Sequence, residues 1–184
     1  MSLASLRLVS SPSGGQPAPQ PSAELDINEL FRKHAPEIQA LGVAMLGKAD
    51  EADDLVQEVF LRAVKGIGSV RDPSKIRSWL ITIAVREGRT RLRRRKVSRL
   101  FLAREEMDFE QLAAAGSSAE DKMQIARLFR VLDGLGVDLR IAWVLRYLQR
   151  ETTQSVAEQC GWSLSTTKRR IQSAHEKVLQ EIGQ

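Results

Sequence analysis

The amino-acid sequence predicts an all-α protein in which two small helical domains are joined by a flexible linker. Apolar residues recur at steps of three and four along most of the chain, which is the spacing of a helix face, and no stretch alternates as a strand does. A segment of shifted composition separates an N-terminal group of predicted helices from a C-terminal group. These two observations carry the prediction.

The predicted helices follow a tail. Residues 1–23 are rich in Ser, Pro, Gly and Gln and hold too few apolar side chains to build a core, so we expect a disordered tail. Residues 25–46 have apolar positions at helical spacing. They predict a helix or a helix pair, perturbed at Pro36 and ended at Gly47.

A second helix is predicted from Asp50 to about Lys65, with two distinct faces. One face is apolar and is expected in the core: Leu55, Val56, Val59, Phe60 and Ala63. The other face combines polar groups with one leucine: Asp54, Gln57, Glu58 and Leu61. Such a face is typical of a protein-docking surface, but on the residues alone an ordinary solvated face is the favoured interpretation.

A third helix is predicted from Lys75 to about Lys96, after a loop that contains two glycines and Pro73. Its first half is amphipathic and its second half is basic, because eight of the fourteen residues from Arg86 to Arg99 are cationic. Like charges at this spacing destabilise a helix unless anions neutralise them, which favours phosphate binding. A solvated run of charge is the alternative.

Residues 97–119 change from mixed to acidic composition and then to small residues, as interdomain linkers do. Two further helices are predicted at 120–132 and 137–149, ahead of the most informative part of the chain.

That part, from Glu151 to Gln180, predicts a helix-turn-helix. Ala157 is small enough for a second helix to cross close by, and Gly161 lies where the first helix must end in a left-handed residue. Ser163 is placed to cap the next helix. The second helix of this motif enters the major groove of DNA. A helical hairpin with a solvated basic face is the alternative.

The second helix of the motif has an apolar stripe and a polar face. The stripe consists of Leu164, Thr167, Ile171, Ala174, Val178 and Ile182. The polar face presents groups that bond to base edges, namely Ser165, Thr166, Arg169, Gln172 and Ser173. Lys168 and Arg170 flank this face and are placed for phosphates.

The overall composition favours a polyanionic partner, since the 184-residue chain has a net charge of +5. The single cysteine, Cys160, occupies an apolar position, so we expect a buried thiol and no disulfide. There is no run of ~18 apolar residues and no signal-peptide pattern. We therefore expect no membrane insertion and a cytoplasmic protein.

No catalytic arrangement is predicted. His34 and His175 are isolated, and no spacing of cysteine and histidine suits zinc. The carboxylates Asp53, Asp54 and Glu58 share one helix face and form a poor metal site. We expect neither an enzyme nor a bound cofactor.

In their order along the chain, these motifs resemble the bacterial extracytoplasmic-function sigma factors. Residues 53–63 (DDLVQEVFLRA) resemble the second-helix signature of that family, and residues 76–80 (IRSWL) with the basic run resemble the next part of the same domain. Residues 146–148 (RYL) and the helix-turn-helix resemble the family's C-terminal domain. The resemblance covers about residues 25–181.

The resemblance implies a subunit that binds core RNA polymerase and directs promoter recognition, DNA melting and transcription initiation. Sigma domain two would occupy residues 24–98, a linker residues 99–119, and sigma domain four residues 120–184. Contacts with the clamp helices of the polymerase would come from Asp54, Gln57, Glu58 and Leu61. The family also implies an anti-sigma factor as a partner.

The resemblance further implies contacts with promoter DNA at two elements. The −10 element would be bound by the loop and the third helix, through Ser69, Arg71, Lys75, Arg86, Arg89 and Arg93. The −35 element would be bound by the helix-turn-helix, through Ser165, Thr166, Lys168, Arg169, Arg170, Gln172 and Ser173.

The chain departs from the family pattern at several positions. Arg86 and Thr90 stand where the family often has asparagine and aspartate, which leaves the base preference at the −10 element open. Arg150 and Glu151 replace a usual glycine and leucine before the helix-turn-helix, and Thr167 replaces a usual valine.

Two other functions stay open on the sequence. One is a stand-alone helix-turn-helix regulator that dimerises on an operator and is not associated with polymerase. The other is a protein-interaction module that docks through its first domain without binding promoters, although the basic polar face argues against it.

Overall fold

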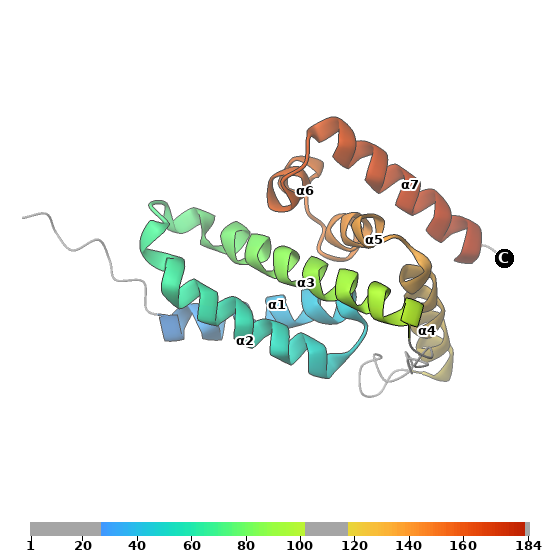
Figure 1. The fold of residues 1–184 in the computed structure, drawn as a ribbon, viewed down its shortest axis with the longest axis horizontal. Helices are drawn as coiled ribbons and strands as arrows, with labels where there is room; N and C mark the ends of the chain where they lie inside the picture. Colours follow the sequence, from blue (N-terminus) through green and yellow to red (C-terminus); the bar gives the residue numbers. More distant parts are fainter. Residues whose placement is uncertain (1–26, 102–117, 183–184) are drawn as a thin grey trace, which may run out of the picture.

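A computed structural model describes residues 27–101 and 118–182. Within these ranges the chain is all-α, as predicted, and has no strand. The predicted tail and most of the predicted linker, including its acidic stretch, lie outside the described residues. Figure 1 shows the helices in two groups, which we call the N-terminal bundle (α1–α3) and the C-terminal bundle (α4–α7).

The N-terminal bundle begins with α1, which is one continuous helix over Ile27–Leu46 and not a helix pair. Pro36 is tolerated because it lies on the exposed side of α1, and Arg32, whose carbonyl a proline cannot bond, is exposed as well. The opposite side of α1 is buried against α2 and α3 through Ile38, Leu41 and Met45. Tertiary packing thus outweighs the local disruption.

The two other long helices of the bundle, α2 and α3, are joined by a short irregular segment. Helix α2 covers Ala49–Gly66, and every residue of its predicted core face is buried. Two single turns of 3-10 helix follow, η1 (Ile67–Ser69) and η2 (Pro73–Lys75). Helix α3 then runs over Ile76–Phe101, five residues beyond the predicted end.

The C-terminal bundle begins with α4 (Ala119–Gly134), which a reciprocal capping box between Ser118 and Asp121 starts. Helix α5 (Val137–Trp143) continues directly into a π-helical segment, η4 (Val144–Leu148), so the predicted helix at 137–149 is a helix of two kinds. Helices α6 (Thr153–Cys160) and α7 (Leu164–Ile182) complete the bundle.

The turn between α6 and α7 has the local geometry that the sequence predicts. Gly161 is left-handed with φ of 68° and ends α6. The amide of Thr166 donates to the Ser163 hydroxyl oxygen at 3.3 Å, as expected of a capping serine. Ala157 is buried, and α6 contacts α7.

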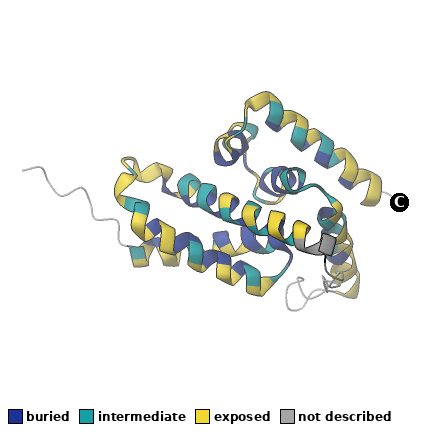
Figure 2. Ribbon diagram, viewed as in Figure 1, coloured by how far each residue is buried: buried dark blue, intermediate teal, exposed yellow. Residues whose placement is uncertain are grey.

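The central part of the predicted apolar stripe of α7 is buried, and the prediction is wrong for the two ends of the stripe. Thr167, Ile171, Ala174 and Val178 are buried, and the Thr167 hydroxyl donates to the Ser163 carbonyl at 3.0 Å. Leu164 and Ile182 are exposed. Both lie in the terminal turns of α7, where helical periodicity continues but the neighbouring helices do not cover it (Figure 2).

The two bundles pack against each other. Helix α3 contacts α5 and α6, and α1 contacts η4. The predicted division into two domains stays a prediction, but the part of α3 that it assigns to DNA lies partly under the C-terminal bundle.

Candidate functional site

The predicted docking face on α2 is exposed. Asp54 and Gln57 face solvent, and the Leu61 side chain keeps 59% of its surface exposed. Glu58 accepts a hydrogen bond from Arg62 Nε at 2.8 Å, and the same nitrogen lies 3.1 Å from a carboxylate oxygen of Glu87 on α3. The face therefore combines one apolar side chain with carboxylates that a single arginine only partly neutralises.

The loop between α2 and α3 presents three predicted −10 residues, Ser69, Arg71 and Lys75, all exposed. The Ser69 hydroxyl donates to the Gly66 carbonyl at 2.6 Å, so it also shapes the turn. Asp72 accepts from the hydroxyl and the amide of Ser74, at 2.7 and 2.9 Å, and these bonds lower the pKa of the Asp72 carboxyl. Asp72 thus caps η2 and fixes the conformation of the loop. Sequence reasoning did not single it out, although Asp before Pro is a common helix start.

The basic run on α3 is neutralised in part from within the molecule. Arg95 donates to the Leu46 carbonyl at 2.7 Å and pairs with Glu51, and Arg91 reaches the Glu51 carbonyl at 3.4 Å. These two arginines therefore hold the ends of α1 and α2 to α3. The sequence had suggested that bound phosphate must neutralise the positive charge of this run. The structure shows that part of this charge is neutralised within the molecule.

The other α3 arginines divide into exposed and covered side chains. Arg86 and Arg93 are exposed, as a contact with DNA requires. Arg89 is not: its side chain is 17% exposed and its guanidinium donates to the Cys160 carbonyl at 3.3 and 3.4 Å. The predicted −10 residue Arg89 is therefore largely covered by the C-terminal bundle.

A single carboxylate brings the two predicted DNA-binding regions together. Asp138, in the first turn of α5, lies 3.4 Å from Arg89 Nε, 3.9 Å from Arg93 Nη2 and 2.9 Å from Arg170 Nη2. The indole of Trp162 lies 5.1 Å from the Arg89 guanidinium and 4.1 Å from that of Arg170. We call these five residues the Asp138 cluster.

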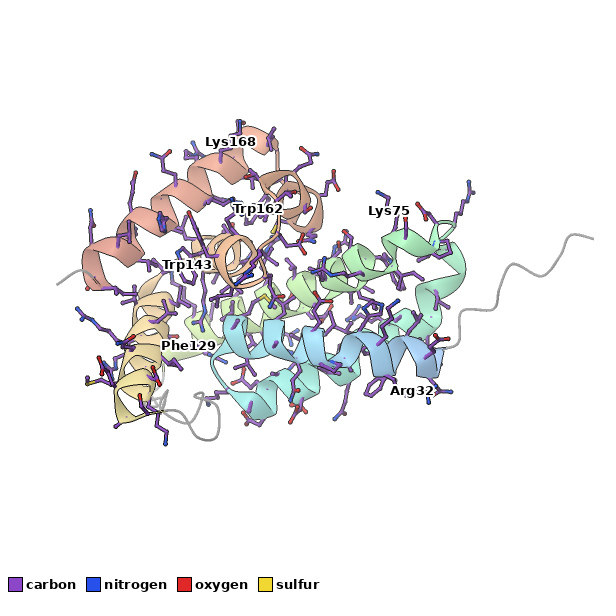
Figure 3. The ribbon with its side chains drawn as sticks, turned by 180° about the vertical axis from the view of Figure 1, so that it is seen from behind. Arg32, Lys75, Phe129, Trp143, Trp162 and Lys168 are labelled. Carbon is purple, nitrogen blue, oxygen red and sulfur yellow. The ribbon has the colours of Figure 1, made fainter. Side chains whose placement is uncertain are left out.

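The remaining predicted −35 residues form the outward face of α7. Ser165, Lys168, Arg169 and Gln172 are exposed, and Thr166 and Ser173 are half-buried. Figure 3 shows Lys168 on the outer side of α7, away from the N-terminal bundle. Gln172 donates to Glu176 at 3.0 Å, a bond that an incoming base edge must replace.

A second interbundle ion pair joins α1, α3 and the segment before α6. Arg77 Nη1 donates to a carboxylate oxygen of Glu151 at 2.7 Å, and Arg77 Nε donates to Glu37 at 3.2 Å. Glu151 is buried, and the preceding Arg150 is left-handed with φ of 56°. Sequence reasoning missed Asp138, this pair and the arginine contacts of Trp162, which it had taken only as an apolar residue of the helix-turn-helix, because no local pattern predicts a partner on another helix.

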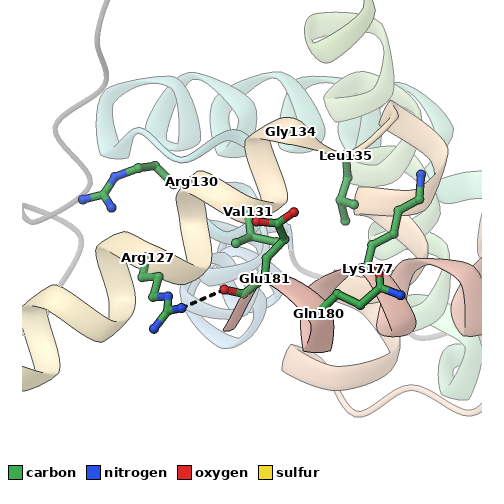
Figure 4. A pocket seen from close by; sticks show the side chains of 8 residues that line it. All are labelled: Arg127, Arg130, Val131, Gly134, Leu135, Lys177, Gln180 and Glu181. Atoms are coloured by element: carbon green, nitrogen blue, oxygen red, sulfur yellow. Dashed lines mark hydrogen bonds between the residues drawn. The ribbon is translucent and has the colours of Figure 1, made fainter. Parts of the chain in front are cut away.

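A groove of about 740 Å³ lies between α4 and α7 (Figure 4). It is lined by the exposed cations Arg127, Arg130 and Lys177 and by the half-buried Val131 and Leu135. Arg127 donates to the Glu181 carbonyl at 2.8 Å. None of these residues belongs to the predicted site, and the groove is separate from the outward face of α7.

The cysteine and the two histidines, which were considered for catalysis or metal binding, have surroundings typical of residues with a structural role. Cys160 is buried, as predicted, and burial raises the pKa of its thiol to about 12. His34 is buried and burial lowers its pKa, while His175 stacks on Tyr147 with ring centroids 4.5 Å apart. Among residues 27–101 and 118–182 no group of His, Cys, Asp and Glu could hold a metal ion. Each helix in those ranges is too short or too polar to cross a membrane.

Comparison with known proteins gives a consistent family. The family described as Sigma-70 region 2 matches residues 30–97. The chain is 32% identical over 148 residues to the ECF RNA polymerase sigma factor EcfG of Rhodopseudomonas palustris, covering 78% of this chain and 77% of that one. It is 29% identical over 161 residues to the ferric citrate uptake sigma factor FecI of Escherichia coli, covering 86% and 91%.

Solved structures share the fold. The sigma factor RpoE of Bartonella quintana, in complex with the anti-sigma factor NepR, superposes with a TM-score of 0.69 at 22% identity, over 86% of this chain and 97% of that one. CnrH, in complex with the cytosolic domain of CnrY, superposes with a TM-score of 0.59 at 20% identity, over 83% and 84%.

Proposed function

Since the chain belongs to the extracytoplasmic-function RNA polymerase sigma factors, we propose that it binds core polymerase through the docking face and contacts one promoter through two separate surfaces. Sigma factors direct transcription initiation and are not enzymes. Membership of this family favours a polymerase subunit over a stand-alone regulator. We place its work in the cytoplasm, where polymerase and DNA are, and we assign sigma domain two to residues 24–98 and sigma domain four to residues 120–184.

The docking face supplies a small apolar contact within an acidic surround. Leu61 is the exposed apolar side chain of this face, and Asp54 and Glu58 supply negative charge on its N-terminal side. Burial of an exposed leucine contributes affinity, while the carboxylates steer a basic partner surface toward it. This combination suits the clamp helices that the family resemblance implies.

The −10 contacts would come from the loop and from the exposed part of α3. Ser69, Arg71 and Lys75 are exposed beside one another in sequence, and Arg86 and Arg93 continue the cationic surface along the helix. Opening a duplex costs a few kcal/mol per unstacked step. Cationic groups that hold the separated strand lower this cost.

The −35 contacts carry the proposal most directly, because the outward face of α7 combines exposure with base-reading chemistry. Arg169 and Gln172 match guanine and adenine edges, and Lys168 matches phosphate. The left-handed Gly161 and the Ser163 cap fix where this helix begins. The N-terminal turns of such a helix are the part that reaches the major groove.

An anti-sigma partner is part of the proposal. The two solved structures named above are complexes with a second protein, named in one case as an anti-sigma factor. We propose that this chain is held by a partner of the same kind.

Transcription of genomic DNA with purified core polymerase tests the function on all promoters of the genome at once. Sequencing of the 5′ ends should give discrete start sites that depend on the chain and share two upstream motifs near −10 and −35. A set of starts identical to that of core enzyme alone would contradict the proposal. Binding of the chain to palindromic DNA as a dimer, without polymerase, would favour the stand-alone regulator.

A further inference from the structure

We infer that the structure shows a closed, self-inhibited state in which Asp138 occupies the place of promoter phosphate for cations of both DNA-binding regions. The inference rests on the proposed function, because it concerns the same arginines. In this state Arg89 and Arg93 of α3 and Arg170 of α7 share one carboxylate. Promoter binding then requires the two bundles to part.

The closed state is too compact to hold a promoter at both elements. The two elements, whose names place them about 25 base pairs apart, are separated by roughly 85 Å of duplex at about 3.4 Å per base pair. Arg89 and Arg170 both lie within ion-pair distance of the same carboxylate. Helix α3, the longest in the described ranges, spans only about 39 Å. One closed molecule therefore cannot reach both elements.

The Asp138 cluster also competes with DNA for charge. The Arg89 and Arg170 side chains are 17% and 27% exposed, and both contact Trp162, so the cluster withdraws cations that DNA would otherwise neutralise. Opening separates Arg89 and Arg93 from Asp138 and returns their guanidinium groups to solvent, whereas Arg170 lies on the same bundle as Asp138 and stays beside it until DNA competes for it. A phosphate backbone and the Asp138 carboxylate then compete for the same cations.

The contacts of the Asp138 cluster are suited to a reversible attachment between the two bundles, which we call the latch. Arg89 Nε and Asp138 Oδ1 are buried and 3.4 Å apart, yet neither makes a hydrogen bond within the part of the chain that the structure describes. A contact between two such atoms stabilises the closed state less than a hydrogen-bonded ion pair would, although the other guanidinium nitrogens of Arg89 bond to the Cys160 carbonyl. The pair between Arg77 and Glu151 holds the opposite end of the same interface.

Replacement of Asp138 by asparagine, which keeps the shape and removes the charge, tests this latch in the full-length chain. Spin labels on cysteines introduced at the exposed positions Ala40 on α1 and Leu179 on α7 report the distance between the bundles. The native Cys160 is buried and has a raised pKa, which restricts labelling to the introduced thiols. Glu158→Gln is the matched control, because it removes one negative charge from an exposed position of α6.

Without DNA or polymerase, the wild type and Glu158→Gln should give one short distance. Asp138→Asn should add a longer, broad distance and raise the ratio of open to closed molecules at least threefold. Its affinity for duplex DNA should rise by a similar factor over that of Glu158→Gln. Identical distance distributions in the wild type and Asp138→Asn would overturn the inference, as would a wild type that is already open.

A second variant tests the same ion pair independently, in case Asp138→Asn does not fold. Arg89→Ala removes the same ion pair from the α3 side, where the core of the N-terminal bundle is formed by other residues, and it should open the chain to a similar extent. A closed Arg89→Ala chain would overturn the inference. The distance measurement involves neither polymerase nor promoter, so failure of the latch and failure of start-specific transcription are separate results.

Discussion

Leu61→Ala is the substitution that separates docking from folding most clearly. Full burial of a leucine side chain is worth about 1.5–3 kcal/mol, and 59% of Leu61 is exposed before any partner binds. If polymerase covers that part, truncation to alanine should cost about 1 kcal/mol of binding, or about a fivefold increase in Kd. Folding should change by no more than about 0.5 kcal/mol, because the side chain is on the surface.

The measurements are the Kd for labelled core polymerase and the free energy of unfolding in urea. Val97→Ala is the control for docking, since Val97 is exposed to a similar degree, 56%, but lies on α3 outside the docking face. Leu55→Ala is the control for folding, since Leu55 is fully buried on the same helix and should cost about 2–5 kcal/mol of stability. Equal Kd values for Leu61→Ala and Val97→Ala would refute the docking assignment.

Four further outcomes are expected. Charge reversal of Asp54 and Glu58 to lysine should weaken polymerase association while leaving DNA binding through α7 unchanged; a loss of neither or of both counts against the docking face. Arg169→Ala should cost about 1–3 kcal/mol of promoter affinity and relax base preference at one −35 position, and an equal loss on every sequence would make Arg169 a phosphate contact. Gly161→Ala should cost about 1 kcal/mol of stability in a thermal or urea melt, because φ is 68° and an added Cβ meets no atom within 4 Å; an unchanged melt would show that the turn relaxes. At pH 8 the Cys160 thiol should react slowly with a thiol reagent in the native chain and rapidly in urea, because burial raises its pKa to about 12; fast native modification would show that α6 opens.

Local chemistry made much of the fold predictable. The core face of α2 follows from helical periodicity alone, and all of its residues are buried. The end of α6 was predictable because glycine adopts a left-handed conformation without strain. Pro36 shows the limit of such rules, since a helix that packs on two neighbours continues through an exposed proline.

The candidate site was predictable only where one helix presents a whole face. The docking face and the outward face of α7 are of this kind, and most of their residues are exposed as expected, while Glu58, Thr166 and Ser173 are half-buried. Arg89 and Arg170 were correctly placed on their helices, but their inward contacts depend on Asp138, which is far from both in sequence. An aspartate in the first turn of a helix is already explained by its favourable interaction with the helix dipole. The sequence around Asp138 therefore did not indicate its arginine partners.

Footprinting of the holoenzyme on a promoter found by genomic transcription tests the central claim, that one chain holds one promoter at two places. The account predicts two protected patches about 25 base pairs apart along the duplex. The upstream patch should weaken in Arg169→Ala, while the downstream patch remains. A single continuous patch, or a protection pattern that is the same with and without the chain, would contradict it.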